Sequence, residues 1–299
     1  MEGSRGLGDV YKRQTLNFFL IFGYWIFPKL GVEGAAIGTL IARFCMLLFI
    51  IFYLKLHKKL SVYIKRFFPS KVEIKRLKKI LYLGLPSALH SFFEVAFFIS
   101  AVWMSGFIGK NSQAANQIAL NLSSMTYMVA LGVGVAAMIR VGNQRGMMNY
   151  KKLREVALST IFLIIFIDVI FCMIFLLLND SLPLLYLDPN NPLSLTDVNQ
   201  VLELASKLLI VAGVFQLFDG IQAVVLGALR GMQDVNKPAI IIFLSYGIIG
   251  FPISYYLGFY TSLSMVGIWL GLLSGLFSSS LFLFLRFNYL SRKIIRLND

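Results

Sequence analysis

The chain has 299 residues, of which 58% are hydrophobic and only 14% are charged. Such a small polar fraction does not cover a soluble globule, and the apolar residues fall in long runs, so the composition indicates a polytopic membrane protein. The net charge of +14 comes mostly from lysines and arginines between these runs, where they mark the cytoplasmic side of a membrane. A nucleic-acid partner is not expected, because no soluble basic face or base-stacking module is visible.

Eight apolar segments approach the length of about 20 residues that a helix needs to cross the hydrocarbon core of a bilayer. They are residues 15–29, 34–54, 79–108, 113–140, 155–178, 201–229, 236–258 and 264–287. Turn-forming residues such as glycine, proline and asparagine separate them. The sequence therefore predicts an all-α fold with about eight transmembrane helices.

The basic residues also predict the orientation. Residues 55–79 carry ten of the 28 lysines and arginines and residues 140–154 carry five, whereas the alternate loops hold only Lys29, Lys110 and Lys207. This asymmetry places both ends in the cytoplasm and residues 179–200 outside. We therefore expect a multi-pass protein of the cell membrane (the inner or plasma membrane).

The basic segment also suggests a domain boundary. Residues 55–78 would link the two helices of 15–54 to a bundle over 79–290, with a cytoplasmic tail at 291–299. Two interpretations of the segment stay open: an amphipathic helix on the inner membrane face, with residues such as Phe67 in the lipid, or a solvated linker.

A weak internal repeat supports two related bundles. Gly34 and Gly38 align with Gly267 and Gly271, and each pair opens a predicted span. Repeats of this kind are a signature of transporters built from two halves. Within its own half of the chain, the first copy has one span before it and the second has five. The first half would therefore lack four helices. Residues 1–14 are polar, and we interpret them as a non-native or disordered tract rather than as part of the fold.

Two acidic residues lie deep inside predicted spans. From a rise of about 1.5 Å per residue, Glu94 lies about 18 Å and Asp219 about 15 Å from the cytoplasmic edge, close to the middle of the membrane. A carboxylate at that depth is costly unless it meets a partner or a cation, so the pair predicts an ion or substrate site and possible Na⁺ ligands. Asp168 is also central in its span, and either a role in the site or local pairing would explain it.

Polar neighbours strengthen this prediction. His90 precedes Glu94 by four residues and so lies on the same helix face, where it would donate a hydrogen bond or compete for a proton. The fourth span is rich in polar residues from Asn116 to Tyr127, which is more typical of a helix that lines a cavity than of one that faces lipid.

Several motifs in order resemble the C-terminal half of the MATE (multidrug and toxin extrusion) transporters, NorM-like branch. They are Val141-Gly142-Asn143 with Gly146, Leu229-Arg230-Gly231 with Asp234 and Lys237-Pro238, and Gly267-Ile268-Trp269-Leu270-Gly271. The similarity covers roughly residues 15–290. It implies helices five to twelve of a twelve-helix fold: a six-helix C-terminal lobe and the last two helices of an N-terminal lobe.

The resemblance also implies a set of site residues. The family's acids on its seventh and tenth helices match Glu94 and Asp219, which belong to the cation and substrate site of the C-terminal lobe. Glutamine and tyrosine positions on the eighth helix match Gln117 and Tyr127, whose amide oxygen and aromatic face suit a cation. Some relatives have tyrosine one turn before the tenth-helix acid, where this chain has Phe215, so one cation ligand would be absent.

The implied function is a secondary antiporter that exports organic cations in exchange for Na⁺ or H⁺, without a cofactor and without enzymatic activity. Its partners would be small organic cations, the lipid bilayer and the missing N-terminal lobe. One alternative is a lipid-linked oligosaccharide flippase of the related superfamily, but such a cavity would be lined with arginine, and Arg43 is the arginine inside a predicted span. The other alternative is a non-transporting membrane remnant or scaffold.

Overall fold

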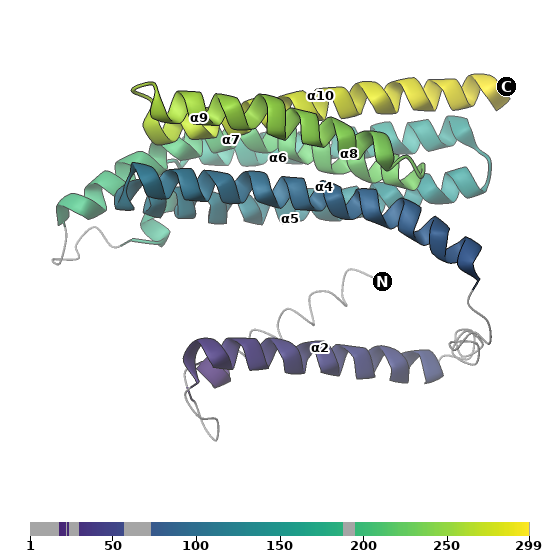
Figure 1. The fold of residues 1–299 in the computed structure, drawn as a ribbon, viewed down its shortest axis with the longest axis horizontal. Helices are drawn as coiled ribbons and strands as arrows, with labels where there is room; N and C mark the ends of the chain where they lie inside the picture. The colour runs from purple at the N-terminus through teal and green to yellow at the C-terminus, as the bar shows by residue number, and fades with distance from the viewer. Residues whose placement is uncertain (1–17, 22, 24–29, 57–72, 188–194, 299) are drawn as a thin grey trace. The chain divides into compact units, whose positions relative to one another are not determined.

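The computed structural model describes residues 18–21, 23, 30–56, 73–187 and 195–298, and the chain divides into two compact units, residues 1–74 and 75–299 (Figure 1). Each unit is considered by itself. Of the first predicted span, only residues 18–21 and 23 are described. Most of the basic segment 55–79 and the whole of 1–14 lie outside the described residues, so the interpretations given for them stay predictions.

The first unit contains the helix α2, Gly31–Leu56. Its side chains are almost all apolar and many are exposed, including Phe44 and Phe52, as expected for a helix in contact with lipid. A Cβ atom on Gly34 would overlap the carbonyl oxygen of Leu20. In the second unit, a Cβ atom on Gly267 would overlap the carbonyl oxygen of Leu257. These two glycines of the predicted repeat thus allow the same kind of contact with a preceding segment.

The second unit is a bundle of long helices that lie along one another (Figure 1). It consists of α4 Ile74–Ile108, α5 Lys110–Gly146, α6 Tyr150–Leu177, the 3-10 turn η1 Leu182–Leu185, α7 Leu195–Gly231, α8 Asn236–Phe243, the π-helical turn η2 Leu244–Gly250, α9 Phe251–Phe259 and α10 Ser264–Asn298. Among the described residues, seven helices are long and apolar enough to cross a membrane, six of them in this unit with α8, η2 and α9 counted as one. The prediction of an all-α polytopic membrane protein is confirmed.

Several helices extend beyond the predicted spans. α4 begins at Ile74, and α10 continues to Asn298, so most of the predicted tail is helical. Hydropathy detects only the apolar part of a helix, whereas the polar ends are stabilised by side-chain contacts. Arg286 pairs with Asp234 at 2.9 Å, and the two terminal guanidinium nitrogens of Arg154 donate to Ser291 and Asn288 at 2.6 Å each.

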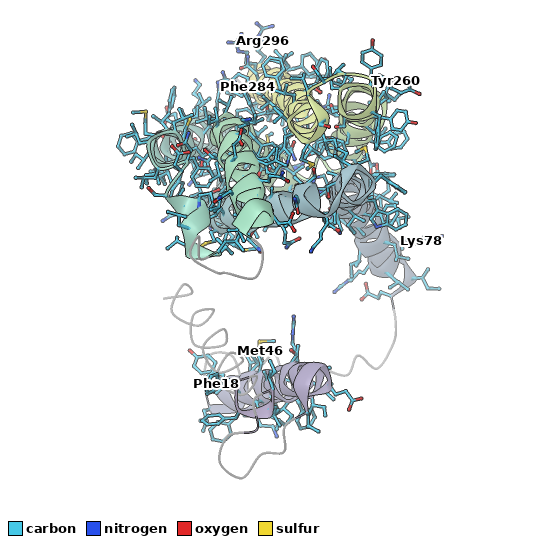
Figure 2. The ribbon with its side chains drawn as sticks, turned by 90° about the vertical axis from the view of Figure 1, so that its left-hand side faces the viewer. Phe18, Met46, Lys78, Tyr260, Phe284 and Arg296 are labelled. Atoms are coloured by element: carbon cyan, nitrogen blue, oxygen red, sulfur yellow. The ribbon has the colours of Figure 1, made fainter. Side chains whose placement is uncertain are left out.

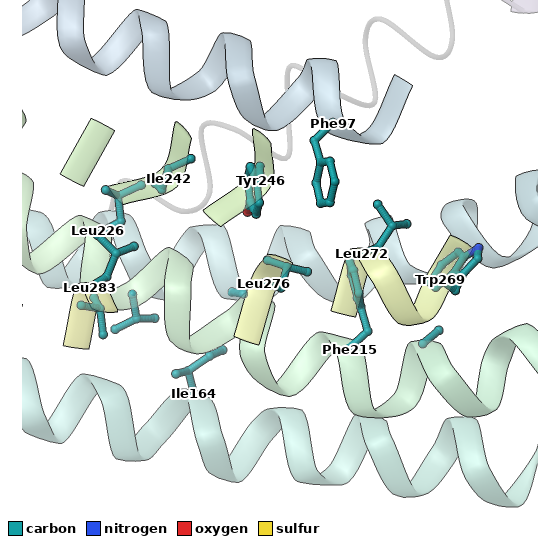
Figure 3. Close-up of a cluster of buried hydrophobic side chains, with 14 of the residues drawn as sticks. Phe97, Ile164, Phe215, Leu226, Ile242, Tyr246, Trp269, Leu272, Leu276 and Leu283 are labelled. Carbon is teal, nitrogen blue, oxygen red and sulfur yellow. The ribbon is translucent and has the colours of Figure 1, made fainter. Parts of the chain in front are cut away.

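α7 is the centre of the second unit and packs against α5, α6 and α10. Its contact with α5 is so close that the two backbones meet: a Cβ atom on Gly227 would overlap the carbonyl oxygen of Gly134, and one on Gly134 would come within 2.8 Å of the carbonyl oxygen of Ala223. Small residues at such crossings are typical of helix pairs in membranes. Figure 3 shows the core beside α7, where Phe215, Leu272 and Leu276 lie together.

α4 contacts the bundle in a different way, through long side chains. The ring of Phe97 stacks on Tyr246 at 4.6 Å between centroids (Figure 3). The same ring lies over the α carbons of two glycines, Gly250 and Gly275, so that a Cβ atom on Gly250 would come within 2.5 Å of the ring. Phe98 adds an edge contact with Phe215 of α7 at 6.0 Å.

The outside of the second unit is covered by apolar side chains that point away from the bundle (Figure 2). Trp103, Phe107 and Phe162 are each at least 70% exposed. In water such a surface would be unfavourable, whereas a bilayer solvates it.

Candidate cation site in the second unit

Glu94 lies on α4, one turn after His90, on the side of the helix that faces the bundle. Its side chain is 13% exposed, and its Oε2 atom is 3.8 Å from Nε2 of His90. The i and i+4 spacing predicted from the sequence therefore does bring these two residues together. Ser91, three residues before Glu94, donates its hydroxyl to the backbone carbonyl of Ser87 instead, so few other groups on this helix can solvate the carboxylate.

Asp219 of α7 lies at the same level as Glu94. α4 and α7 run in opposite directions, and the contact between Phe98 and Phe215 fixes their register. Glu94 precedes Phe98 by four residues and Asp219 follows Phe215 by four, so both acids lie one turn from that contact, on the same side of it. Asp219 is 6% exposed, and its Oδ1 atom has no hydrogen-bond partner within the described part of the chain.

Tyr127 of α5 completes the group. Its hydroxyl lies near the carboxylate of Glu94, and it is close enough to Asp219 for the charge of that carboxylate to act on it. The glycine contact between α5 and α7 holds the two helices together about two turns further along α5. A phenol and two carboxylates from three helices thus converge.

Two further polar residues belong to this neighbourhood, and the sequence analysis did not single them out. Gln222 of α7 donates from Nε2 to the hydroxyl of Tyr246 at 2.6 Å, and that hydroxyl donates back to Oε1 at 2.9 Å. Both carboxylates act electrostatically on Tyr246. Tyr246 lies in the π-helical turn η2, a distortion that is frequent at functional sites. A polar Gln222 three residues after Asp219 was the available sequence signal.

Arg230, in the last turn of α7, is the third residue that the sequence analysis left out of the site. One of its terminal nitrogens lies 3.0 Å from Nδ1 of His90, and its charge acts on Glu94 and Tyr127. In the sequence it belongs to a family motif at the end of a span, where lysine and arginine counting treats it as a loop residue.

Two predicted site residues are not brought to the acids. Gln117 is exposed on α5 and precedes Tyr127 by ten residues, which is about 15 Å along the helix. Its neighbour Asn116 is the buried one, and accepts a hydrogen bond from Nε1 of Trp269 at 3.0 Å. Phe215 is 1% exposed and packs between Phe98 and Trp269. The roles expected for Gln117 and Phe215 stay predictions.

Asp168 lies on α6, which packs against α7. It is 1% exposed, and a Cβ atom on Gly220 would overlap its Oδ2 atom. That oxygen has no hydrogen-bond partner in the regions that the structure describes. The local pairing considered for Asp168 in the sequence analysis is therefore not seen for this oxygen, although its charge does act on Asp219.

The chemistry of the group suits a cation. Carboxylate, phenol and amide oxygens are hard ligands of the kind that alkali ions take, and aromatic faces attract organic cations. In the described ranges, no group of three or more His, Cys, Asp or Glu side chains has the arrangement of a metal site. A cation here would be held by two carboxylates and neutral oxygens, which favours reversible binding over a resident metal.

The comparisons with known proteins agree on one family. The MatE family model matches residues 86–256. The chain is 33% identical to the "Probable multidrug resistance protein NorM" of Agrobacterium fabrum over 281 residues, which is 93% of this chain and 59% of that protein. It is 32% identical to the protein of the same name from Bacillus subtilis, over 93% of this chain and 60% of that protein. The chain therefore spans about three fifths of the length of these relatives.

Solved structures show the same fold. A crystal structure of MATE in complex with MaL6 superimposes with a TM-score of 0.81 at 23% identity and covers 98% of this chain and 64% of that chain. The eukaryotic MATE transporter AtDTX14 gives a TM-score of 0.80 at 19% identity, over 96% of this chain and 62% of that chain. The family model and the relatives together show that this chain belongs to the MatE family of membrane transporters.

Proposed function

We propose that the chain works as part of a secondary active antiporter that exports organic cations in exchange for Na⁺ or H⁺, and that Glu94 and Asp219 bind both kinds of cation in turn. The observation that carries the proposal is the placement of these two acids at one level on facing helices, with Oδ1 of Asp219 lacking a partner among the described atoms. The charge of Glu94 acts on Asp219, so the two carboxylates repel each other when both are charged, and a bound cation relieves that repulsion.

The names of the relatives support export of drugs, because both NorM proteins are described as probable multidrug resistance proteins. Exchange follows from a shared site: if the coupling ion and the organic cation use the same carboxylates, binding of one displaces the other. Gln117, which is exposed on α5, and Phe215, which lies one turn before Asp219, are proposed contacts for a large substrate. We place the protein in the cell membrane with both ends in the cytoplasm, as its basic segments indicate.

The test measures how far Na⁺ or an organic cation raises the midpoint of thermal unfolding of the purified chain, which we call its protection. We compare Glu94→Gln, Asp219→Asn and the double variant. For a shared site, each single change should remove most of the protection that the double change removes. Glu203→Gln is a matched control, because Glu203 is an acid on the same helix as Asp219 but is 70% exposed and paired with Lys207. Purely additive losses would show two independent acids and contradict the proposal.

A flippase for an acidic lipid-linked sugar is the second candidate, and Arg230 is the observation that favours it, because it places a guanidinium near the site. The two carboxylates outweigh this one positive charge, so a cationic substrate fits better. Protection of the chain by an anionic lipid-linked sugar, together with none by organic cations, would reverse this preference. A non-transporting remnant or scaffold would show no cation-dependent protection in any variant.

A further inference from the structure

The contact between Arg230 and His90 fixes where the proton of the histidine lies. A guanidinium carries only hydrogen-bond donors, so at 3.0 Å the Nδ1 atom of His90 must accept. The ring proton then lies on Nε2, which is 3.8 Å from Oε2 of Glu94 and has no hydrogen-bond partner among the described residues. His90 is therefore a neutral link between a permanent positive charge and one of the two acids.

The position of Arg230 at a helix end does not by itself explain where its side chain lies. Basic residues in the last turn of a helix are favoured by the helix dipole, and an arginine serving only that purpose would direct its guanidinium to the final carbonyl groups or to solvent. Here the side chain is half-buried and donates to a histidine on another helix, α4. Its charge acts on Glu94 and Tyr127, so it belongs to the electrostatics of the site.

We infer that Arg230 is an internal cation of the site: it offsets part of the negative charge of Glu94 and Asp219, so the site favours monovalent cations over dications. The inference rests on the proposed function and specifies its substrate class. Arg230 is a specificity-determining residue, and His90 is the positioning residue through which it reaches Glu94. Asp168, whose charge also acts on Asp219, is the same in all the Arg230 variants compared below and does not affect that comparison.

The experiment compares two probes on the purified chain: tetraphenylphosphonium, with one positive charge, and methyl viologen, with two. The measured quantity is the ratio of their dissociation constants. Arg230→Gln removes the internal cation, so the affinity for the dication should rise about tenfold relative to the monocation, within the usual range of coupling between charged sites. Arg230→Lys keeps the charge and should keep the ratio of the unmodified chain.

A double variant tests the charge count directly. Arg230→Gln with Glu94→Gln loses one positive and one negative charge and so has the same net charge as the unmodified chain, and its ratio should return toward that of the unmodified chain. Glu203→Gln removes an acid of α7 that is 70% exposed and paired with Lys207, so it should leave the ratio unchanged. A ratio that does not change in Arg230→Gln overturns the inference alone, whereas binding of neither probe by any variant overturns the proposed function and the inference with it.

Nitrogen NMR of the two histidines, His57 and His90, gives a second readout that does not depend on cation binding. In a chain with His57→Gln, the signals of His90 should show the proton on Nε2. In Arg230→Gln this preference should disappear, because Nδ1 has lost its donor. A proton on Nδ1 in the chain with Arg230 intact would contradict the link between Arg230 and Glu94.

Discussion

The second unit contains two kinds of helix contact, and they differ in how much they can change. α5 and α7 meet backbone to backbone through Gly134 and Gly227, whereas α4 reaches the same bundle through Phe97, Phe98 and His90. In the described residues, no neighbouring backbone approaches α4 as closely as α5 approaches α7. A backbone contact allows one arrangement, but side-chain contacts have alternative rotamers.

This difference coincides with the position of the two acids. Asp219 lies on the closely packed helix α7, and Glu94 lies on α4, so a cation between them would connect the fixed part of the unit with the part held by side chains. Binding or release of a cation would change the distance between two helices whose contacts tolerate that change. The comparison therefore predicts that substitutions in the α7 contacts affect stability most, and those on α4 less.

The largest effect should come from Gly227. In Gly227→Leu the new side chain would overlap the carbonyl oxygen of Gly134 and force α5 and α7 apart, at a cost of about 3 kcal/mol. We expect the midpoint of thermal unfolding to fall by roughly 10 °C. Gly132→Leu is the matched control on α5, because nothing lies within 4 Å of a Cβ atom there. Equal losses in the two variants would show that the close contact is not what stabilises the pair.

The contact of α6 with α7 should be almost as sensitive to substitution, and a second substitution should restore the lost stability. A Cβ atom on Gly220 would overlap Oδ2 of Asp168, so Gly220→Ala should destabilise the chain by about 2 kcal/mol. Asp168→Ala removes the obstructing carboxyl, and the double variant should therefore recover most of the loss. Thermal unfolding of the three variants measures this, and simple additivity would contradict a direct clash.

The sequence predicted the fold better than the site. Hydropathy located the spans because the apolar stretches are long, and Glu94 and Asp219 were recognisable as charges within them. Arg230 was not, since a basic residue at a helix end has the same pattern whether its side chain turns to solvent or inward. Gln117 and Asn116 are adjacent in a helix that is polar on several sides, and only the rotation of α5 shows that Asn116 is the buried one.

On α4 a large aromatic side chain is expected to matter less than the glycines of α7. Phe97 is 4% exposed and stacks on Tyr246, and Phe97→Ala would leave a cavity. We expect a loss of about 2 kcal/mol, less than in a water-soluble core, because lipid solvates an unpacked side chain well. Phe92→Ala changes a ring on the same helix that is 65% exposed and should have almost no effect. A loss for Phe97→Ala larger than for Gly227→Leu would reverse the comparison between the two kinds of contact.

The smallest predicted effect concerns Asp168 and decides whether the α6 side of α7 belongs to the site. Oδ2 of Asp168 is buried without a hydrogen-bond partner among the residues described, and a buried polar group in that state is destabilising. Asp168→Asn has nearly the same shape but carries no charge, so it should raise stability by about 1 kcal/mol.

If Asp168 lies outside the site, protection by Na⁺ should be the same before and after the change. Loss of that protection, with or without a gain in stability, would instead make Asp168 a third acid of the cation site. The two measurements are independent, because thermal unfolding without Na⁺ reports the cost of burial and the shift on adding Na⁺ reports binding.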